Sequence, residues 1–103
     1  MAWAKAWSDR DVEAYLSAYV PGYHPPGLSH GDWVGKRRER IQAPKWIKVE
    51  VLDPKMTRSS PDRVEVVYRQ VYQTEDSRLT SRKRIELTFL DGGWRIQEEK
   101  EAR

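Results

Sequence analysis

The side chains best suited to bind or transform a ligand begin with one arginine. Arg37 shares a predicted helical stripe with Trp33 and Ile41, at positions i, i+4 and i+8, so its guanidinium is expected to be partly buried. An unpaired buried charge destabilises a fold by several kcal/mol, and a carboxylate partner is therefore required. We predict an ion pair between Arg37 and a C-terminal glutamate, which either holds the fold together or anchors an anionic ligand.

Two glutamates compete for this pairing. Strict alternation from Trp94 and Ile96 selects Glu98 for the same strand face. A bulge, which is common at strand ends, would select Glu99 instead. Both stay open at this stage.

Gln70 lies between Tyr68 and Tyr72 on one face of a predicted strand. Buried amides are normally hydrogen-bonded, so Gln70 is either a satisfied core residue or a group on a pocket floor that orients a ligand beside Tyr72. Lys83 lies two residues before Ile85, so both fall on the same face of a predicted strand. We predict that Lys83 lies in the pocket or extends its ammonium group to solvent.

No metal site, cofactor or catalytic residue is predicted. His24 and His30 flank a proline-rich loop and are expected at the surface, because two histidines without a third nearby ligand form a weak metal signal. Tyr23 follows the first helical region and is expected near the pocket mouth, and Trp33 on its wall. Apart from the C-terminal glutamates, the acidic residues fall in turns, caps or outward strand positions.

The elements that position these residues are helices followed by strands. Apolar residues at helical spacing predict helix over about residues 1–20, with a kink or second start near Ser8. Ser29 is the predicted cap of another helix, which Pro44 closes. From Trp46 onward the period changes to two, and turns near Pro61, Asp76 and residues 91–93 separate four strands. Helices followed by hairpin-linked strands predict an α+β fold with an antiparallel meander.

Two further strand features are predicted. Asp53-Pro54 should break or bulge the first strand, because proline cannot donate to a sheet ladder. Val67 and Val71 fall on the outer face of the second strand, where they would form an exposed apolar patch for a homodimer.

Composition agrees with one domain over residues 1–103, with a core built on five Trp and five Tyr. The net charge of +3 comes from interleaved signs, so we predict no nucleic-acid partner. There is no cysteine, no apolar run of membrane-spanning length, and no signal segment in the first 20 residues.

Several ordered patterns together resemble the nuclear transport factor 2-like superfamily in its SnoaL-like branch. More narrowly, they resemble a small C-terminal domain of bacterial L,D-transpeptidase-related and tetratricopeptide-containing proteins. The matching positions are AWSDRDVEAYLSAY with Trp3, Trp33-x-x-x-Arg37-x-x-Arg40-Ile41, Pro44, Tyr68-x-Gln70-x-Tyr72, Arg82-Lys83, and Gly93-Trp94-Arg95-Ile96 with a glutamate soon after. The resemblance implies helices on a curved, cone-shaped sheet with a pocket at its wide end. It also favours Glu99 as the partner of Arg37.

Two functions follow from these patterns. The first is a non-catalytic accessory domain that binds a small molecule or cell-wall fragment and dimerises through the sheet. The resemblance implies a periplasmic or envelope-associated location, although a cytoplasmic one stays open. The alternative is a small isomerase, dehydratase or hydrolase with Glu98 or Glu99 as base and Tyr72 and Arg37 as stabilisers.

Overall fold

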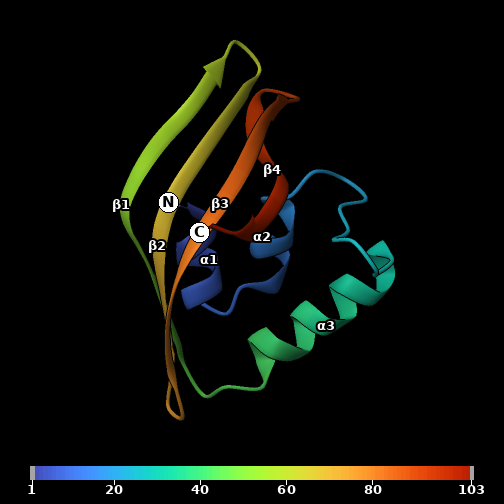
Figure 1. Cartoon of the computed structure of the whole chain (residues 1–103). Coiled ribbons are helices and arrows are strands. Elements are labelled where there is room, and N and C mark those ends of the chain that lie inside the picture. Colours follow the sequence, from blue (N-terminus) through green and yellow to red (C-terminus); the bar gives the residue numbers. More distant parts are fainter. Residues whose placement is uncertain (1, 103) are drawn as a thin grey trace.

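The fold consists of three helices followed by a four-stranded antiparallel sheet. The computed structural model describes residues 2–102. The helices are α1 (Ala2–Ser8), α2 (Val12–Ser17) and α3 (His30–Gln42), and the strands are β1 (Ile47–Ser60), β2 (Arg63–Thr74), β3 (Arg78–Leu90) and β4 (Gly93–Glu101). The strand order is β1-β2-β3-β4. The sheet curves around α1 and α2, with α3 beside them (Figure 1). The predicted α+β architecture is confirmed.

The predicted break after the first helix is confirmed, but its capping residue is Asp11. The Asp11 carboxylate accepts a hydrogen bond from the Ala14 backbone N–H at 3.2 Å. Ser8 instead ends α1, and its hydroxyl accepts a hydrogen bond from the Val49 backbone N–H of β1 at 2.9 Å. Arg10, between the helices, has a φ of 58°, which turns the chain sharply.

The loop between α1 and α2 also holds the end of α3. The Arg10 guanidinium donates to the carbonyls of Ile41 at 3.1 Å, Gln42 at 2.6 Å and Lys45 at 3.3 Å. The last carbonyls of a helix have no partner inside it, so a cation there supplies both hydrogen bonds and favourable charge. At the other end, Ser29 caps α3 as predicted, accepting from the Asp32 N–H at 3.1 Å.

A bulge in β4 decides which glutamate points inward. Glu86 is opposite Glu98 and Leu87 is opposite Ile96, so Gln97 is an extra residue in β4. The extra residue shifts the alternation by one position. Ile96 and Glu99 therefore share the inner face, and Glu98 points outward.

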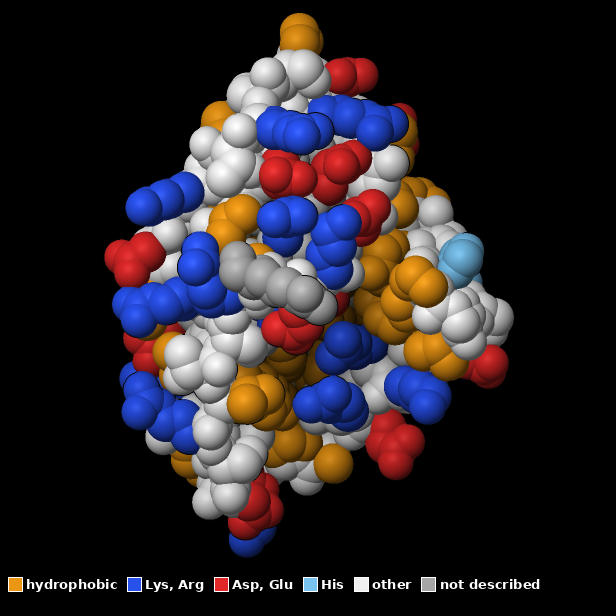
Figure 2. Space-filling model, viewed as in Figure 1, with side chains coloured by type: hydrophobic (Ala, Val, Ile, Leu, Met, Phe, Trp, Pro, Cys, Tyr) orange, Lys and Arg blue, Asp and Glu red, His pale blue; other side chains and the backbone are white. Residues whose placement is uncertain are grey.

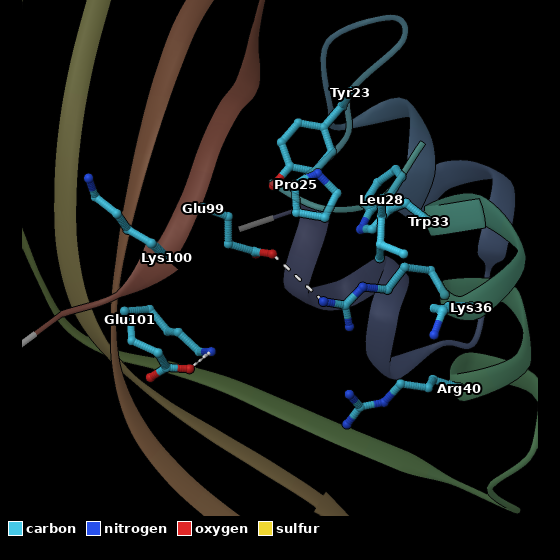
Figure 3. A pocket seen from close by; sticks show the side chains of 11 residues that line it. Tyr23, Pro25, Leu28, Trp33, Lys36, Arg40, Glu99, Lys100 and Glu101 are labelled. Atoms are coloured by element: carbon cyan, nitrogen blue, oxygen red, sulfur yellow. Dashed lines mark hydrogen bonds and ion pairs between the residues drawn. The ribbon is translucent and has the colours of Figure 1, made fainter. Parts of the chain in front are cut away.

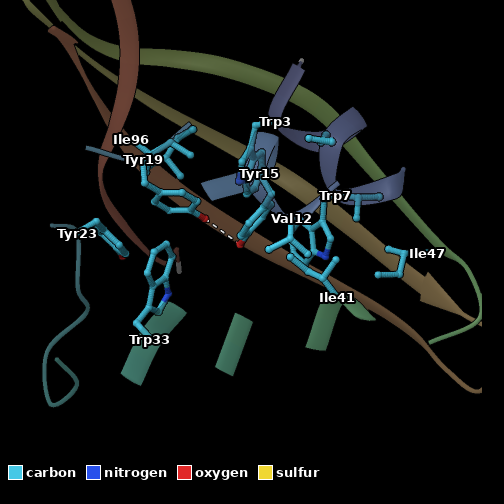
Figure 4. Close-up of a cluster of buried hydrophobic side chains, with 14 of the residues drawn as sticks. Trp3, Trp7, Val12, Tyr15, Tyr19, Tyr23, Trp33, Ile41, Ile47 and Ile96 are labelled. Atoms are coloured by element: carbon cyan, nitrogen blue, oxygen red, sulfur yellow. Dashed lines mark hydrogen bonds between the residues drawn. The ribbon is translucent and has the colours of Figure 1, made fainter. Parts of the chain in front are cut away.

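The core is a continuous cluster of aromatic rings between the helices and the sheet (Figure 4). Ring centroids lie 5.4 Å apart for Trp3–Trp7, Trp7–Tyr15 and Tyr15–Tyr19, and 4.8 Å apart for Tyr19–Trp33. These separations are typical of favourable aromatic pairs. The rings link α1, α2 and α3 to one another, which compensates for the short length of the first two helices.

The outer face of the sheet is not the apolar patch that the sequence predicted. Val71 has only 4% of its surface exposed, and it lies between Glu50 and Thr80 in the strand register. Val67 is half-buried. The prediction was wrong because neighbouring strands cover a central strand's side chains even on a solvent-facing side. Among residues 2–102, no helix has the length and apolar character needed to cross a membrane.

A charged cleft between α3 and the sheet

A cleft of about 370 Å³ opens between α3, the loop that precedes it and the ends of β3 and β4 (Figure 3). We call this the main chamber. It is lined by Tyr23, Pro25, Leu28, Trp33, Lys36, Arg37, Arg40, Lys83, Glu99, Lys100 and Glu101. Figure 2 shows Lys and Arg side chains at the rim of the hollow beside α3, with hydrophobic side chains within it.

A side chamber of about 180 Å³ continues the cleft along the inner face of the sheet. The two chambers share five lining residues, namely Arg37, Arg40, Lys83, Glu99 and Glu101. The side chamber adds Trp7, Gln70, Tyr72, Leu79 and Ser81. Of the eight residues that the sequence predicted for a pocket, only Glu98 lies outside the cleft, because the β4 bulge turns it outward to pair with Lys100 at 2.9 Å.

Arg37 and Glu99 form the ion pair at the boundary of the two chambers. The distance from Arg37 Nη2 to Glu99 Oε1 is 3.9 Å, and the two side chains are 25% and 15% exposed. The pair is therefore longer and more solvated than a fully buried salt bridge. A separation of this length leaves the guanidinium with N–H groups free to meet a ligand.

A chain of tyrosine hydroxyls supports Glu99 from the core. Glu99 Oε2 accepts a hydrogen bond from the Tyr19 hydroxyl at 3.1 Å, and the Tyr19 and Tyr15 hydroxyls are 3.0 Å apart. Burial raises the pKa of Tyr15 to about 12, and burial beside Glu99 raises the pKa of Tyr19 well above its usual value. Both tyrosines are therefore neutral donors at physiological pH.

Lys83 lies in the cleft and is paired. Its ammonium group donates to Glu101, which lies opposite it in the β3–β4 register. The Lys83 side chain is 20% exposed and the Glu101 side chain 68% exposed. Lys83 thus contributes positive charge to the cleft wall and is held in place by an exposed acidic partner.

Two further cations on α3 have no acidic partner in the described chain. Lys36 and Arg40 are four residues apart, so they lie on the same helix edge, and neither forms an ion pair within residues 2–102. The sequence analysis missed both as site residues. The sequence did contain a signal for them. Lys36 and Arg40 lie at i−1 and i+3 from Arg37, so they flank this inward residue on the same side of the helix.

Gln70 is the most buried polar side chain of the cleft. It is 5% exposed and lines the side chamber, yet its amide makes no side-chain hydrogen bond within residues 2–102. Tyr72 beside it packs on Trp7, with ring centroids 5.4 Å apart. Buried amides normally have partners, so an amide facing a cavity has free capacity for a ligand or water.

The remaining wall of the main chamber is apolar. The Tyr23 and Trp33 rings meet edge to face at 4.7 Å, and Pro25 and Leu28 complete this side. His24 and His30 are both exposed, as the sequence predicted, and His30 bonds the Tyr23 carbonyl through Nδ1 at 2.7 Å. Within residues 2–102, no group of three or more His, Cys, Asp or Glu side chains is arranged to hold a metal ion.

A curved antiparallel sheet that wraps helices and encloses a cleft at one end defines the NTF2-like class of domain. The chain belongs to the family of Cds6 C-terminal NTF2-like domains, whose sequence profile matches residues 1–100. No curated protein sequence matches this chain.

Solved structures share the fold at low sequence identity. Bd1075 of Bdellovibrio bacteriovorus has a TM-score of 0.86 and 24% identity, with 98% of this chain and 36% of Bd1075 covered. The helical cell shape determining protein Pgp2 of Campylobacter jejuni, as a K307A mutant, has a TM-score of 0.81 and 14% identity over 95% of this chain and 36% of Pgp2. The chain spans just over a third of the length of both.

A third structure covers most of a shorter protein. It is a provisionally assigned NTF2-like dehydratase from Streptomyces avermitilis, with a TM-score of 0.71 and 12% identity over 95% of this chain and 86% of that protein. At these identities the likeness establishes the fold alone.

Proposed function

We propose that this chain is a non-catalytic binding domain whose cleft holds a small anionic ligand. The observation that carries the proposal is Gln70, a buried side chain (5% exposed) that lines the side chamber and forms no side-chain hydrogen bond within residues 2–102. An amide that lines a cavity and has no protein partner can form hydrogen bonds with a ligand that enters the cavity. Lys36 and Arg40, which have no ion pair within residues 2–102, supply the charge for an anion at the mouth.

The lining specifies the kind of ligand. The aromatic and aliphatic wall of Tyr23, Trp33 and Leu28 suits an apolar or sugar body, and the α3 cations suit a carboxylate or phosphate. A soluble cell-wall fragment, with sugars and a peptide that bears free carboxylates, has this composition. This chain spans only 36% of Pgp2, a cell-shape determining protein. That comparison supports a role as an accessory module of a larger envelope protein.

The binding test uses the full chain and soluble disaccharide–peptide fragments in an NMR titration. We expect shifts at Gln70, Tyr72 and the α3 edge, and about tenfold weaker binding for Arg40→Ala, because one charged hydrogen bond is lost. Arg58→Ala removes the same charge from an exposed site outside the cleft and serves as the control. Equal weakening in both variants, or shifts that avoid the cleft, would overturn the proposal.

A second candidate function is a small isomerase, dehydratase or hydrolase with Glu99 as base. The observation in its favour is a carboxylate inside the cleft beside the Tyr19 hydroxyl. Against it, the Arg37 guanidinium lies 3.9 Å from one Glu99 oxygen and the Tyr19 hydroxyl bonds the other, so the carboxylate already has partners within the chain. Turnover of a bound ligand, seen as new ligand resonances that Glu99→Gln abolishes, would favour the enzyme over the binding domain.

The homodimer through the outer sheet face is not part of this proposal. That face has no exposed valine pair, and ten of its side chains are cationic against five that are acidic, so two copies would oppose like charges. Sedimentation at high micromolar concentration should find a monomer.

A further inference from the structure

The outer face of the sheet holds a second hollow, of about 220 Å³, on the side away from the helices. It is lined by Asp53, Lys55, Val67, Tyr68, Arg69 and Arg82. The hollow forms where the β1–β2 ladder is interrupted between Leu52 and Lys55. Asp53 in this gap has a φ of 51° and Pro54 cannot donate a hydrogen bond, so β1 bends away from β2.

Cations surround this hollow in two neighbouring rows of the sheet. The strand register places Arg69 opposite Arg82, and in the next row Lys55, Val67, Arg84 and Lys100 lie side by side. Strands are about 4.8 Å apart and same-face residues about 6.8 Å apart along a strand, so Arg69, Arg82, Arg84 and Lys100 are close neighbours, and Lys55 lies across Val67 from Arg84. We call the five residues Lys55, Arg69, Arg82, Arg84 and Lys100 the basic grid.

Most of the grid is free to bind. Lys55, Arg82 and Arg84 form no ion pair within residues 2–102, and the Arg84 Nε is buried without a hydrogen-bond partner. Arg69 pairs with Asp53 at 2.9 Å, with both side chains more than half exposed. Lys100 pairs with Glu98 in the same way. Exposed pairs of this kind contribute little and exchange readily for another anion.

The charge of the whole chain is concentrated on this face. Its outward strand positions carry ten cations, namely Lys48, Lys55, Arg58, Arg63, Arg69, Arg78, Arg82, Arg84, Arg95 and Lys100, and five acids, namely Glu50, Asp53, Glu65, Glu86 and Glu98. The face is therefore +5, whereas the complete chain is +3 with 19 basic and 16 acidic residues. The other nine basic and 11 acidic residues leave a net charge of −2. Interleaving along the sequence hides this clustering.

We infer that the basic grid is a binding site for a linear polyanion that carries repeated phosphate groups and no bases. Neighbouring cations along Arg69, Arg82, Arg84 and Lys100 are about 5–7 Å apart, so they meet several charges of one chain at once, which multiplies the affinity of each contact. No aromatic side chain points outward from the grid rows, and single-stranded nucleic acids need such side chains for stacking. The sheet bends (Figure 1), so a flexible chain can follow its convex side where a flat bilayer touches fewer cations.

The test is an NMR titration of the full chain with inorganic polyphosphate at low salt, beside the same titration with monomeric phosphate. We expect shifts at residues 53–55, 67–69 and 82–84, and far tighter binding of the polymer than of the monomer. The double variant Arg82→Gln/Arg84→Gln should bind polyphosphate about tenfold more weakly, and the slope of log affinity against log salt should fall by about 1 to 2.

The matched control is Arg58→Gln/Arg78→Gln, which removes the same charge from the same face outside the hollow. Its affinity should change by less than about twofold. The inference is overturned if both double variants weaken binding equally, because net charge alone would then explain it. It is also overturned if the polymer shifts only the cleft, if monomer and polymer bind alike, or if only phosphatidylglycerol vesicles bind.

Discussion

The guanidinium of Arg37 and the carboxylate of Glu99 face each other at 3.9 Å across the boundary of the two cleft chambers. One comes from the middle of α3 and the other from the last strand, so the pair joins the two walls of the cleft. Its length and partial exposure distinguish it from a tight buried salt bridge, whose loss would destabilise the fold by about 3–5 kcal/mol.

We expect Glu99→Gln to reduce the free energy of unfolding by about 1–2 kcal/mol, because Arg37 then faces the cleft without its counter-charge. A double-mutant cycle with Arg37→Met, measured by urea denaturation, should give a coupling of about 0.5–1.5 kcal/mol. A coupling above about 3 kcal/mol would show that the pair is desolvated and closed, contrary to the structure.

Tyr19→Phe tests the hydroxyl chain behind Glu99. The change removes the hydrogen bond to the Glu99 carboxylate and the one shared with Tyr15, so stability should fall by about 1–2 kcal/mol. Tyr23→Phe is the matched control, since the Tyr23 hydroxyl forms no side-chain hydrogen bond within residues 2–102. Thermal or urea unfolding should show a clearly larger loss of stability for Tyr19→Phe than for Tyr23→Phe. Equal losses would contradict the role of the hydroxyl chain behind Glu99.

Alkaline pH should unfold the protein through its buried tyrosines. The pKa of Tyr15 is raised from 10.0 to about 12 by burial, so the folded state holds the phenol proton more tightly than the unfolded state. The resulting stability is complete below about pH 10 and is lost as the pH rises towards 12. Urea midpoints measured across this range should fall steeply, and Tyr15→Phe should make the fall shallower.

Arg10 should prove to be a positioning residue for the cleft wall. Arg10→Ala removes two hydrogen bonds to carbonyls at the end of α3 and one to the Lys45 carbonyl beyond it, and we expect a loss of about 1–3 kcal/mol. Arg10→Gly loses the same bonds but relieves the positive φ of 58°, so it should be more stable than the alanine variant by about 0.5–1 kcal/mol. The reverse order would contradict the left-handed conformation.

Gln70→Leu separates a structural amide from a ligand-binding one. The Gln70 amide bonds to no side chain or backbone group within residues 2–102, so a leucine of similar size should leave stability unchanged or raise it. Binding of cell-wall fragments should weaken about tenfold. A loss of more than about 2 kcal/mol in unfolding free energy would show that Gln70 has a structural role instead.

Much of the fold could be predicted because local chemistry agrees with the tertiary structure. The Ser29 cap, the break at Asp53-Pro54 and the alternation of the strands are all local signals. The cap of α2 could not be predicted in the same way. Ser8 and Asp11 are both good capping residues, and what decides between them is that Val49, 41 positions away, donates its N–H to Ser8.

The candidate site was partly predictable for similar reasons. Helical spacing placed Arg37 beside Trp33, but it could not show that the side chain stays a quarter exposed. The choice between Glu98 and Glu99 depends on one extra residue, Gln97, whose bulge is set by pairing with β3 rather than by its own sequence. The partners of a cleft residue come from distant strands, and only the folded register brings them together.

The uneven division of charge gives the domain a permanent dipole moment that runs through the sheet, with its positive end on the convex side and a remainder of net charge −2 behind it. In the field of a negatively charged matrix such a molecule rotates before contact, because its positive end turns toward the matrix. The domain therefore binds in a preferred orientation. The convex side would land first and the cleft would be left facing outward. A domain held in this way could present its cleft to a second molecule without letting go of the first.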